Sequence, residues 1–272
     1  VWHKDFKADY GAAVPMWGFA GHPLVHRDAV VCLVGAPDGL LVAFDKETGR
    51  ERWRGPATPE AGPGYCPPTL IEAGGTTQLI AWTPREVTSL NPADGRVHWE
   101  VPLAPKYGMA IVAPRRSGDL LFVGGMGAAA ALRLGTDAPT AEVAWRAGKG
   151  VGGVYPGNGT PHVVDGVVYA VDHLGHLRAV RLESGERLWD STTPVTGKPH
   201  DAAARGPDWG TAYLVRRGDR FWVFAETGDL AVAKVTPAGY EELGRAHLVD
   251  PTAEAVGRPV AWAHPAFADR CV

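Results

Sequence analysis

A repeated pairing of glycine with tryptophan constrains the fold of this 272-residue chain more than any other feature. Three segments, 43–53, 89–99 and 179–189, each run from an apolar strand through a turn to a glycine, and a tryptophan follows that glycine by four residues. The pairs are Gly49/Trp53, Gly95/Trp99 and Gly185/Trp189. Self-similarity at a fixed spacing is the signature of a repeat architecture.

Weaker copies extend the repeat over the whole chain. Gly239 is followed by Leu243 in place of tryptophan, and Trp145 ends a copy with a longer turn. Trp2 reads as the end of one more copy. The equivalent positions 2, 53, 99, 145, 189 and 243 are spaced 51, 46, 46, 44 and 54 residues apart. This period is too long for most helical hairpin arrays and fits a four-stranded propeller blade.

Each repeat also contains the same pattern of strands. Segments 22–35, 160–172 and 211–226 read as strand pairs, and the middle one alternates apolar residues around a turn at Asp165–Gly166. A third strand follows at 39–44, 175–180 and 228–233. Glycine after the third strand supplies the positive φ of a tight turn to the fourth. The sequence therefore predicts an all-β fold, a β-propeller of four-stranded blades.

About five complete blades are expected, in one domain that spans residues 1–272. Their approximate bounds are 21–55, 64–102, 108–148, 158–192 and 209–249. The tryptophans are expected on the outermost strands, packed across to a neighbouring blade. A propeller exposes its end blades unless the ring closes. We therefore expect a domain that is incomplete at both ends, beginning at a fourth-strand Trp2 and ending as a new blade starts at 264–272.

The turn motif resembles the PQQ-like (pyrroloquinoline-quinone-type) repeat family, whose signature is D-x-x-T/S-G-x-x-x-W. Asp45, Thr48, Gly49 and Trp53 match that signature. Asn91, Asp94, Gly95 and Trp99 match it more loosely, and the third copy matches except at its first position, Arg181. The segment 218–252 further resembles uncharacterised PQQ-like propeller proteins of planctomycete-type bacteria. The resemblance implies a larger ring, usually of eight blades. A six-bladed ring completed by the strand of Trp2 is the alternative, and it would need two more strands after Val272.

One residue leads into the innermost strand of each blade, usually just before a proline. These residues are His22, Cys66, Ala113, Thr160, Thr211 and His264. Because their spacing follows the repeat, we expect them to form a rough ring at the mouth of the central channel. Two imidazoles and a thiol could bind zinc or copper. Their positions on different blades favour polar channel lining instead, and no metal site is assigned.

The loops between blades are rich in aromatic and polar residues. Besides the ring positions they contribute Tyr65, Tyr107, Met109, Tyr155, Asn158, His200 and Trp209. Such residues at a channel mouth suit a sugar, a quinone or a peptide segment. The loop 190–210 exceeds ordinary connection length, which favours a functional or solvated role.

The resemblance also raises the question of quinone chemistry. Dehydrogenases of this superfamily bind PQQ beside Ca²⁺ and carry an adjacent cysteine pair. Here Cys32, Cys66 and Cys271 are dispersed. Asp172, Asp201 and Asp208 are candidates for a base or a Ca²⁺ ligand, but none has a diagnostic context. PQQ with calcium is therefore not supported by a cysteine pair.

Charge and hydropathy exclude other classes of function. A net charge of −3 without a basic run is unsuited to nucleic acid, which needs clustered Lys and Arg. No apolar stretch approaches the roughly 20 residues needed to cross a bilayer. An odd number of cysteines leaves the redox compartment open.

These observations favour a non-catalytic binding or scaffold propeller that holds a protein or a small ligand at the channel mouth. A PQQ-dependent alcohol or sugar oxidoreductase is the first alternative, and a carbohydrate-binding propeller is the second. The family resemblance implies an exported, periplasmic protein whose leader is absent from this chain.

Overall fold

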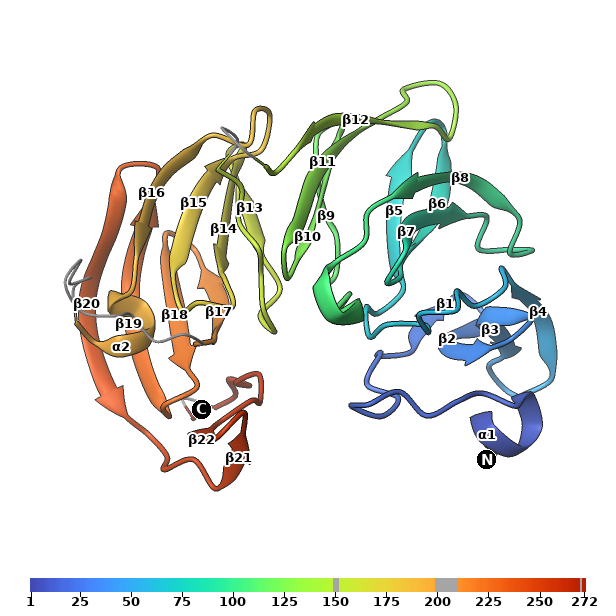
Figure 1. Ribbon diagram of the computed structural model, residues 1–272, viewed down its shortest axis with the longest axis horizontal. Coiled ribbons are helices and arrows are strands. Elements are labelled where there is room, and N and C mark those ends of the chain that lie inside the picture. Colours follow the sequence, from blue (N-terminus) through green and yellow to red (C-terminus); the bar gives the residue numbers. More distant parts are fainter. Residues whose placement is uncertain (149–151, 199–209, 270) are drawn as a thin grey trace. The chain divides into compact units, whose positions relative to one another are not determined.

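The computed structural model describes residues 1–148, 152–198, 210–269 and 271–272 (Figure 1). The described chain is built from antiparallel sheets with two short α-helices and one 3-10 turn, so the all-β prediction is confirmed. It forms two compact units, Val1–Trp145 and Arg146–Val272, and each is treated separately below.

The first unit holds three four-stranded antiparallel sheets. They consist of β1 (Leu24–His26), β2 (Ala29–Ala36), β3 (Gly39–Asp45) and β4 (Glu51–Gly55); β5 (Thr69–Ala73), β6 (Thr76–Trp82), β7 (Glu86–Leu90) and β8 (Val97–Pro102); and β9 (Arg115–Ser117), β10 (Leu120–Gly125), β11 (Ala128–Leu134) and β12 (Ala141–Arg146), whose last residue belongs to the second unit. Strands neighbouring in sequence are neighbours in each sheet, as expected for propeller blades.

The second unit holds two further sheets of the same topology and a separate two-stranded hairpin. The strands are β13 (His162–Val164), β14 (Val167–Val171), β15 (Leu177–Arg181) and β16 (Arg187–Ser191); β17 (Ala212–Arg217), β18 (Arg220–Ala225), β19 (Asp229–Thr236) and β20 (Gly239–His247); and the hairpin β21 (Ala253–Ala255) and β22 (Arg258–Val260). At the predicted turn between β13 and β14, Asp165 and Gly166 both have positive φ, 49° and 74°.

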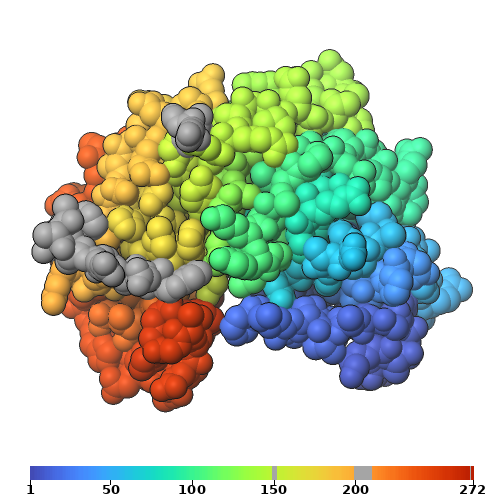
Figure 2. Space-filling view, in the orientation of Figure 1, coloured from blue at the N-terminus to red at the C-terminus, as the bar shows by residue number. Residues whose placement is uncertain are grey.

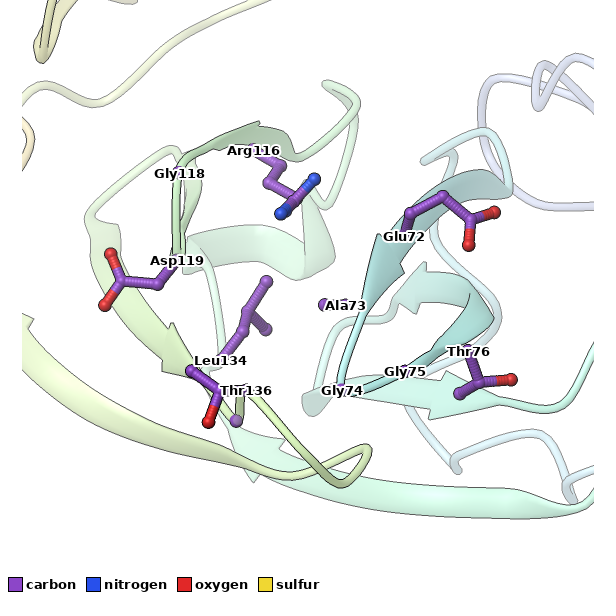
Figure 3. A pocket seen from close by; sticks show the side chains of 11 residues that line it. Glu72, Ala73, Gly74, Gly75, Thr76, Arg116, Gly118, Asp119, Leu134 and Thr136 are labelled. Carbon is purple, nitrogen blue, oxygen red and sulfur yellow. The ribbon is translucent and has the colours of Figure 1, made fainter.

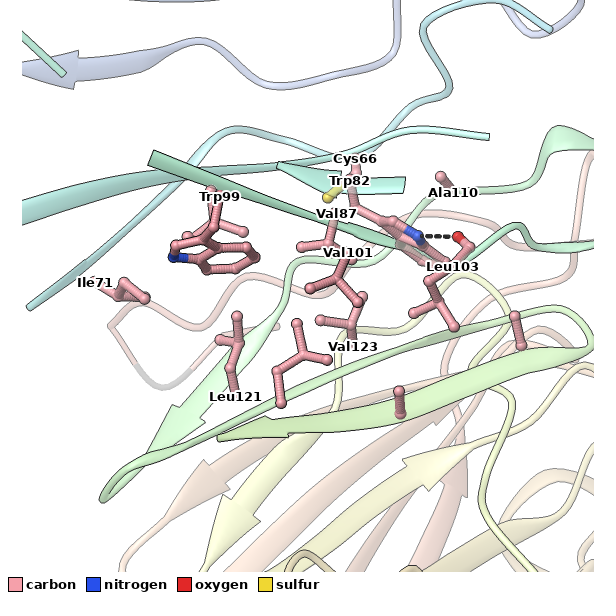
Figure 4. Close-up of a cluster of buried hydrophobic side chains, with 14 of the residues drawn as sticks. Cys66, Ile71, Trp82, Val87, Trp99, Val101, Leu103, Ala110, Leu121 and Val123 are labelled. Atoms are coloured by element: carbon pink, nitrogen blue, oxygen red, sulfur yellow. Dashed lines mark hydrogen bonds between the residues drawn. The ribbon is translucent and has the colours of Figure 1, made fainter. Parts of the chain in front are cut away.

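Within each unit the cores lie between successive sheets. In the first unit a cluster of buried side chains joins β6, β7 and β8 to β10 and β11, with Trp82 and Leu121 almost completely buried (Figure 4). The Trp82 indole donates a hydrogen bond to the Leu103 carbonyl at 2.9 Å, which satisfies the one polar atom of that buried side chain. Central strands are buried on both faces because each sheet packs against its neighbours, as β14 in the second unit shows.

Two tryptophans of the repeat, Trp53 and Trp189, reach from a fourth strand to the turn of the following sheet. Trp53 of β4 donates from its indole Nε1 to the Pro92 carbonyl at 3.1 Å. Trp189 of β16 makes the equivalent bond to the Thr236 carbonyl at 2.9 Å. Each bond joins one sheet to the turn between the third and fourth strands of the next.

Trp2 makes the same kind of contact without a strand. Its Nε1 donates to the Lys46 carbonyl at 2.9 Å, and Trp2 lies outside any strand, unlike the prediction that it ends a fourth strand. Trp2 instead precedes helix α1 (Phe6–Tyr10), which is capped by the Asp5 carboxylate and by Gly11. Together they cover Phe44 of the first sheet.

Trp99 bonds differently from Trp2 and Trp53 in the first unit. Its Nε1 donates to Oε1 of Gln78 in its own sheet, at 2.9 Å. Gln78 is completely buried, accepts a second hydrogen bond from Ser89 Oγ and donates to the Ala73 carbonyl. A single buried amide thus accepts the indole N–H, while the Trp99 ring packs in the core between the second and third sheets.

The C-terminal segment differs from its prediction. His264 does not lie at the start of a strand; the hairpin β21–β22 precedes it, and residues 261–267 fold back on the fifth sheet. The Ala261 N–H donates to the Glu226 carbonyl at 2.8 Å, and Phe267 packs on Trp222 with ring centroids 5.2 Å apart. In the space-filling view this red segment is a compact body against the orange sheet (Figure 2). The backbone bond and the ring contact account for this arrangement.

Candidate functional site

Two loops with predicted site residues lie together in the first unit. The Tyr65 N–H donates to the Ala110 carbonyl at 2.7 Å. The Cys66 thiol is buried and contacts the Val112 carbonyl at 3.4 Å. Burial raises the pKa of Cys66 to about 12, so its thiol stays protonated at neutral pH.

The other predicted residues of this unit lie nearer the surface. Tyr107 is 82% exposed and Met109 is half-buried, both at the 3-10 turn η1 (Lys106–Gly108). His22 is exposed before β1. No polar bond between these three side chains appears among the described residues, so their binding role stays a prediction.

A denser cluster of polar contacts surrounds Glu226 in the second unit. Glu226 follows β18, and its side chain is buried. Thr211 Oγ1 donates to its Oε2 at 2.8 Å. Arg258 donates from Nε to Oε1 at 2.8 Å and from Nη2 to Oε2 at 3.1 Å. Trp262 Nε1 donates to Oε2 at 2.9 Å. We call these four residues the Glu226 clasp.

Two further predicted residues contact Tyr213, which lies next to the Glu226 clasp on β17. His264 packs on the Tyr213 ring with centroids 5.4 Å apart. Burial raises the pKa of Tyr213 to about 12, while a hydrogen bond from Asn158 opposes that rise. The structure therefore brings Asn158, Thr211 and His264 into one neighbourhood.

The electrostatics of the clasp favour an ionised carboxylate. Burial raises the pKa of Glu226, but the hydrogen bonds from Arg258, Trp262 and Thr211 lower it. The lowering is larger than the rise, so the pKa lies below the ordinary value of 4.5. All the donors act on the charged form. Glu226 is thus an unsuitable general base, because its proton affinity is lowered and its lone pairs are already engaged.

Four aromatic side chains lie on the clasp or on the sheet beside it. We use "aromatic face" for Trp222, Trp262, His264 and Phe267. His264 and Phe267 are exposed, and the two tryptophans are half-buried. The Arg258 guanidinium lies 5.9 Å from the centre of the Trp262 ring, within cation–π range. The clasp therefore fixes an arginine and an aromatic ring on the surface.

Sequence reasoning missed Glu226, Arg258 and Trp262. The one available signal was a carboxylate directly after the buried strand end Phe224–Ala225, where an unpaired charge would be costly. Thr160 lies half-buried before β13, outside the clasp contacts. His200 and Trp209, with Asp201 and Asp208, fall outside the described residues.

Asp172 and Glu226, two buried carboxylates, do not fit a PQQ–calcium site. Asp172 is completely buried, but its Oδ1 accepts the N–H groups of Leu174 and His176, and its Oδ2 lies 2.8 Å from Arg178 Nη2. The Glu226 carboxylate is engaged by its own arginine. No group of three or more His, Cys, Asp and Glu side chains suited to a metal occurs in the described part of the chain.

The repeat and the sheets agree with a comparison against protein families. The family model described as outer membrane protein assembly factor BamB matches residues 1–189 and 108–256. The chain belongs to this family. The BamB family match confirms the resemblance to PQQ-type repeats. A comparison with curated proteins found no match.

Solved structures show the fold of this BamB-family chain. A europium-containing methanol dehydrogenase is 13% identical to this chain, with a TM-score of 0.56. The match covers 92% of this chain and 55% of the dehydrogenase. The quinohemoprotein alcohol dehydrogenase from Comamonas testosteroni is 12% identical, with a TM-score of 0.54. The match covers 85% of this chain and 43% of the dehydrogenase. BamB from Moraxella catarrhalis is 19% identical, with a TM-score of 0.48. The match covers 85% of this chain and 77% of that protein.

The likenesses to the two dehydrogenases establish the β-propeller fold and nothing about activity. The chain spans about half the length of the two dehydrogenases. Among the described residues, the helices are all too short or too polar to cross a bilayer.

Proposed function

We propose that this propeller is a non-catalytic scaffold that binds a polypeptide partner through the aromatic face. The observation that carries the proposal is the clasp, in which buried Glu226 fixes Arg258 and Trp262 by three hydrogen bonds. Tryptophan, tyrosine and arginine dominate the energetics of protein interfaces. Side chains held in place before binding lose less conformational entropy when the partner arrives.

The chemistry of the clasp favours binding over catalysis. A general base needs a free lone pair within reach of a substrate proton. The Glu226 carboxylate instead accepts bonds from three side chains, and its pKa is lowered. The same carboxylate acts well as an anchor, because removing one partner of a buried pair is costly.

The family supports a protein partner and an exported location. The BamB family model is described as an outer membrane protein assembly factor, which is a role exercised on other polypeptides. We propose that this chain works in the periplasm and holds a partner there.

Site-specific photo-crosslinking tests this proposal. A photoreactive amino acid at His264 is expected to yield one discrete adduct in the cell envelope, and the adduct should weaken severalfold when Trp262→Ala is added. The same amino acid at Val143, an exposed position on β12, is the control and should yield no such adduct.

A PQQ titration tests the alternative, an oxidoreductase. Stoichiometric, Ca²⁺-dependent PQQ binding with alcohol-dependent reduction would overturn the scaffold role and establish the oxidoreductase. An adduct at position 264 that is indifferent to Trp262→Ala would also contradict the proposal, because the aromatic face would then not be the contact.

A further inference from the structure

A groove lies between the second and third sheets of the first unit, at the hairpin turns (Figure 3). Its volume is about 400 Å³, within the range of small-ligand sites. The turn between β5 and β6 lines one side, and the turns β9–β10 and β11–β12 line the other. The residues used below are Glu72, Gly74, Gly75, Arg116, Gly118 and Asp119.

The groove lies where the usual contact of the repeat, an indole docked on the turn of the next sheet, is absent. We call that contact the tryptophan joint. Between the first and second sheets, the equivalent groove measures about 240 Å³ and Trp53 is part of its lining. Between the second and third sheets, Trp99 is held by Gln78 and does not line the groove. The larger groove is thus the one that the indole does not line.

Here the backbone of Gly74 in the second sheet contacts the turn 135–140 of the third sheet directly. A Cβ on Gly74 would lie 2.2 Å from the Ala138 carbonyl oxygen, so only glycine allows the rebuilt turn 135–140 to approach this closely. Gly74 and Gly75 both have positive φ, 59° and 70°. The groove wall is thus a fixed glycine turn.

Arg116 is the one cation that lines this groove. Its side chain extends into the space between the two sheets, whereas Glu72 and Asp119 point away from it (Figure 3). Glu72 accepts a hydrogen bond from Thr77, and Asp119 pairs with Arg133. In the part of the chain that is described, no carboxylate lies within salt-bridge distance of Arg116.

We propose that this groove binds a carboxylate group, held by a bidentate pair with the Arg116 guanidinium. The planar fork of arginine matches a carboxylate with two parallel N–H···O bonds. One cation between two acidic residues suits a single negative charge. A phosphate dianion would meet stronger repulsion from Glu72 and Asp119 and would need further cations.

The carboxylate has two chemical sources, a free small acid or an acidic side chain on a bound polypeptide. The two are told apart by comparing acetate with N-acetyl-glutamate N-methylamide, which carries the same group on a peptide backbone. The neutral N-acetyl-glutamine N-methylamide lacks the charge and serves as the ligand control.

Amide chemical-shift titrations of the full 272-residue chain test the site. Carboxylate probes are expected to shift the amides of Gly74, Gly75 and Gly118, and the glutamine probe should not. Arg116→Gln should weaken binding roughly tenfold or more, because it removes the charge-assisted pair. Tighter binding of the glutamate probe than of acetate assigns the site to a polypeptide, and equal binding assigns it to a free acid.

Arg216→Gln is the matched control variant. Arg216 is exposed on β17 and precedes an Arg-Gly-Asp turn, much as Arg116 precedes Ser-Gly-Asp. It should leave the titration unchanged. The proposal is overturned by absent shifts in the groove, by equal weakening in both variants, or by inorganic phosphate binding more tightly than acetate.

Discussion

The indole of Trp53 lies directly over the backbone of Gly95 in the next sheet. A Cβ on Gly95 would come within 2.5 Å of the ring carbon Cε3, and Gly95 has a φ of +74°. The glycine therefore serves two needs at once, a left-handed backbone and room for the neighbouring ring.

Replacing Gly95 with alanine should destabilise the first unit by about 2–4 kcal/mol, the combined cost of left-handed strain and overpacking. Gly166→Ala is the matched control, because Gly166 also has a φ of +74° but open space where the Cβ would lie. It should cost only about 1–2 kcal/mol. Urea denaturation measures both values, and equal losses would show that the indole contact adds nothing.

Gln78→Leu should destabilise the same unit by about 2–4 kcal/mol. The change leaves the Trp99 indole N–H and the Ser89 hydroxyl without their buried acceptor. Thr77→Val is the control, since Thr77 bonds only an exposed Glu72, and it should change stability by less than about 1 kcal/mol. A Gln78→Leu protein as stable as wild type would mean that Trp99 finds another acceptor, for example by docking on the turn 135–140.

The attachment of the hairpin β21–β22 should weaken in acid. The folded-state pKa of Glu226 is lowered, so its contribution is present above the ordinary value of 4.5 and is lost as pH falls through the lower folded value. Hydrogen exchange at the Ala261 amide, corrected for its intrinsic rate, measures this attachment. Protection should fall below about pH 4.5 in the wild type.

In Glu226→Gln the same amide should be less protected at neutral pH and should show no such acid transition. This variant keeps the side-chain shape but removes the charge that Arg258 and Trp262 contact. An acid transition that persists unchanged in Glu226→Gln would assign it to another carboxyl group.

His247 should titrate above its ordinary pKa of 6.5. Its Nδ1 lies 2.8 Å from Asp229 and its Nε2 lies 2.9 Å from Asp250, and these carboxylates raise its pKa in that order. The stabilisation is therefore complete below pH 6.5 and is lost as pH rises through the higher folded value.

Histidine ring NMR shifts measure this pKa. Asp250→Asn should lower it toward 6.5, because one of the two negative charges is removed. Asp219→Asn, on the exposed β17–β18 turn, should leave it unchanged. A His247 pKa at or below 6.5 in the wild type would contradict the bridging geometry.

The sequence predicted the sheets well because the repeat is local. Glycine, tryptophan and the alternating strands of one blade lie within about fifty residues, and the same physics acts in each copy. Trp2 was placed correctly by its spacing but wrongly as a strand, since spacing reports the docking of an indole and not the hydrogen bonds around it.

The candidate site was only partly predictable. Thr211 and His264 stood out by their position in the repeat, but Glu226 joins Thr211 to Arg258 and Trp262, which come 32 and 36 residues after it. These contacts depend on how the segment after the fifth sheet folds back, and no periodic signal describes it. Gln78 was missed for a related reason, because an amide inside a strand looks like any solvent-facing residue until its burial is known.

The tryptophan joints make the blades interchangeable units. The blade containing Trp53 carries an indole that docks on the next sheet and, at Gly49, a surface on which the Trp2 indole docks. Duplicating such a blade would supply both halves of the new contact, so a blade can be added by copying without redesign of the interface. The third blade, with its turn 135–140 fitted to Gly74, is committed to one neighbour and could not be copied in this way.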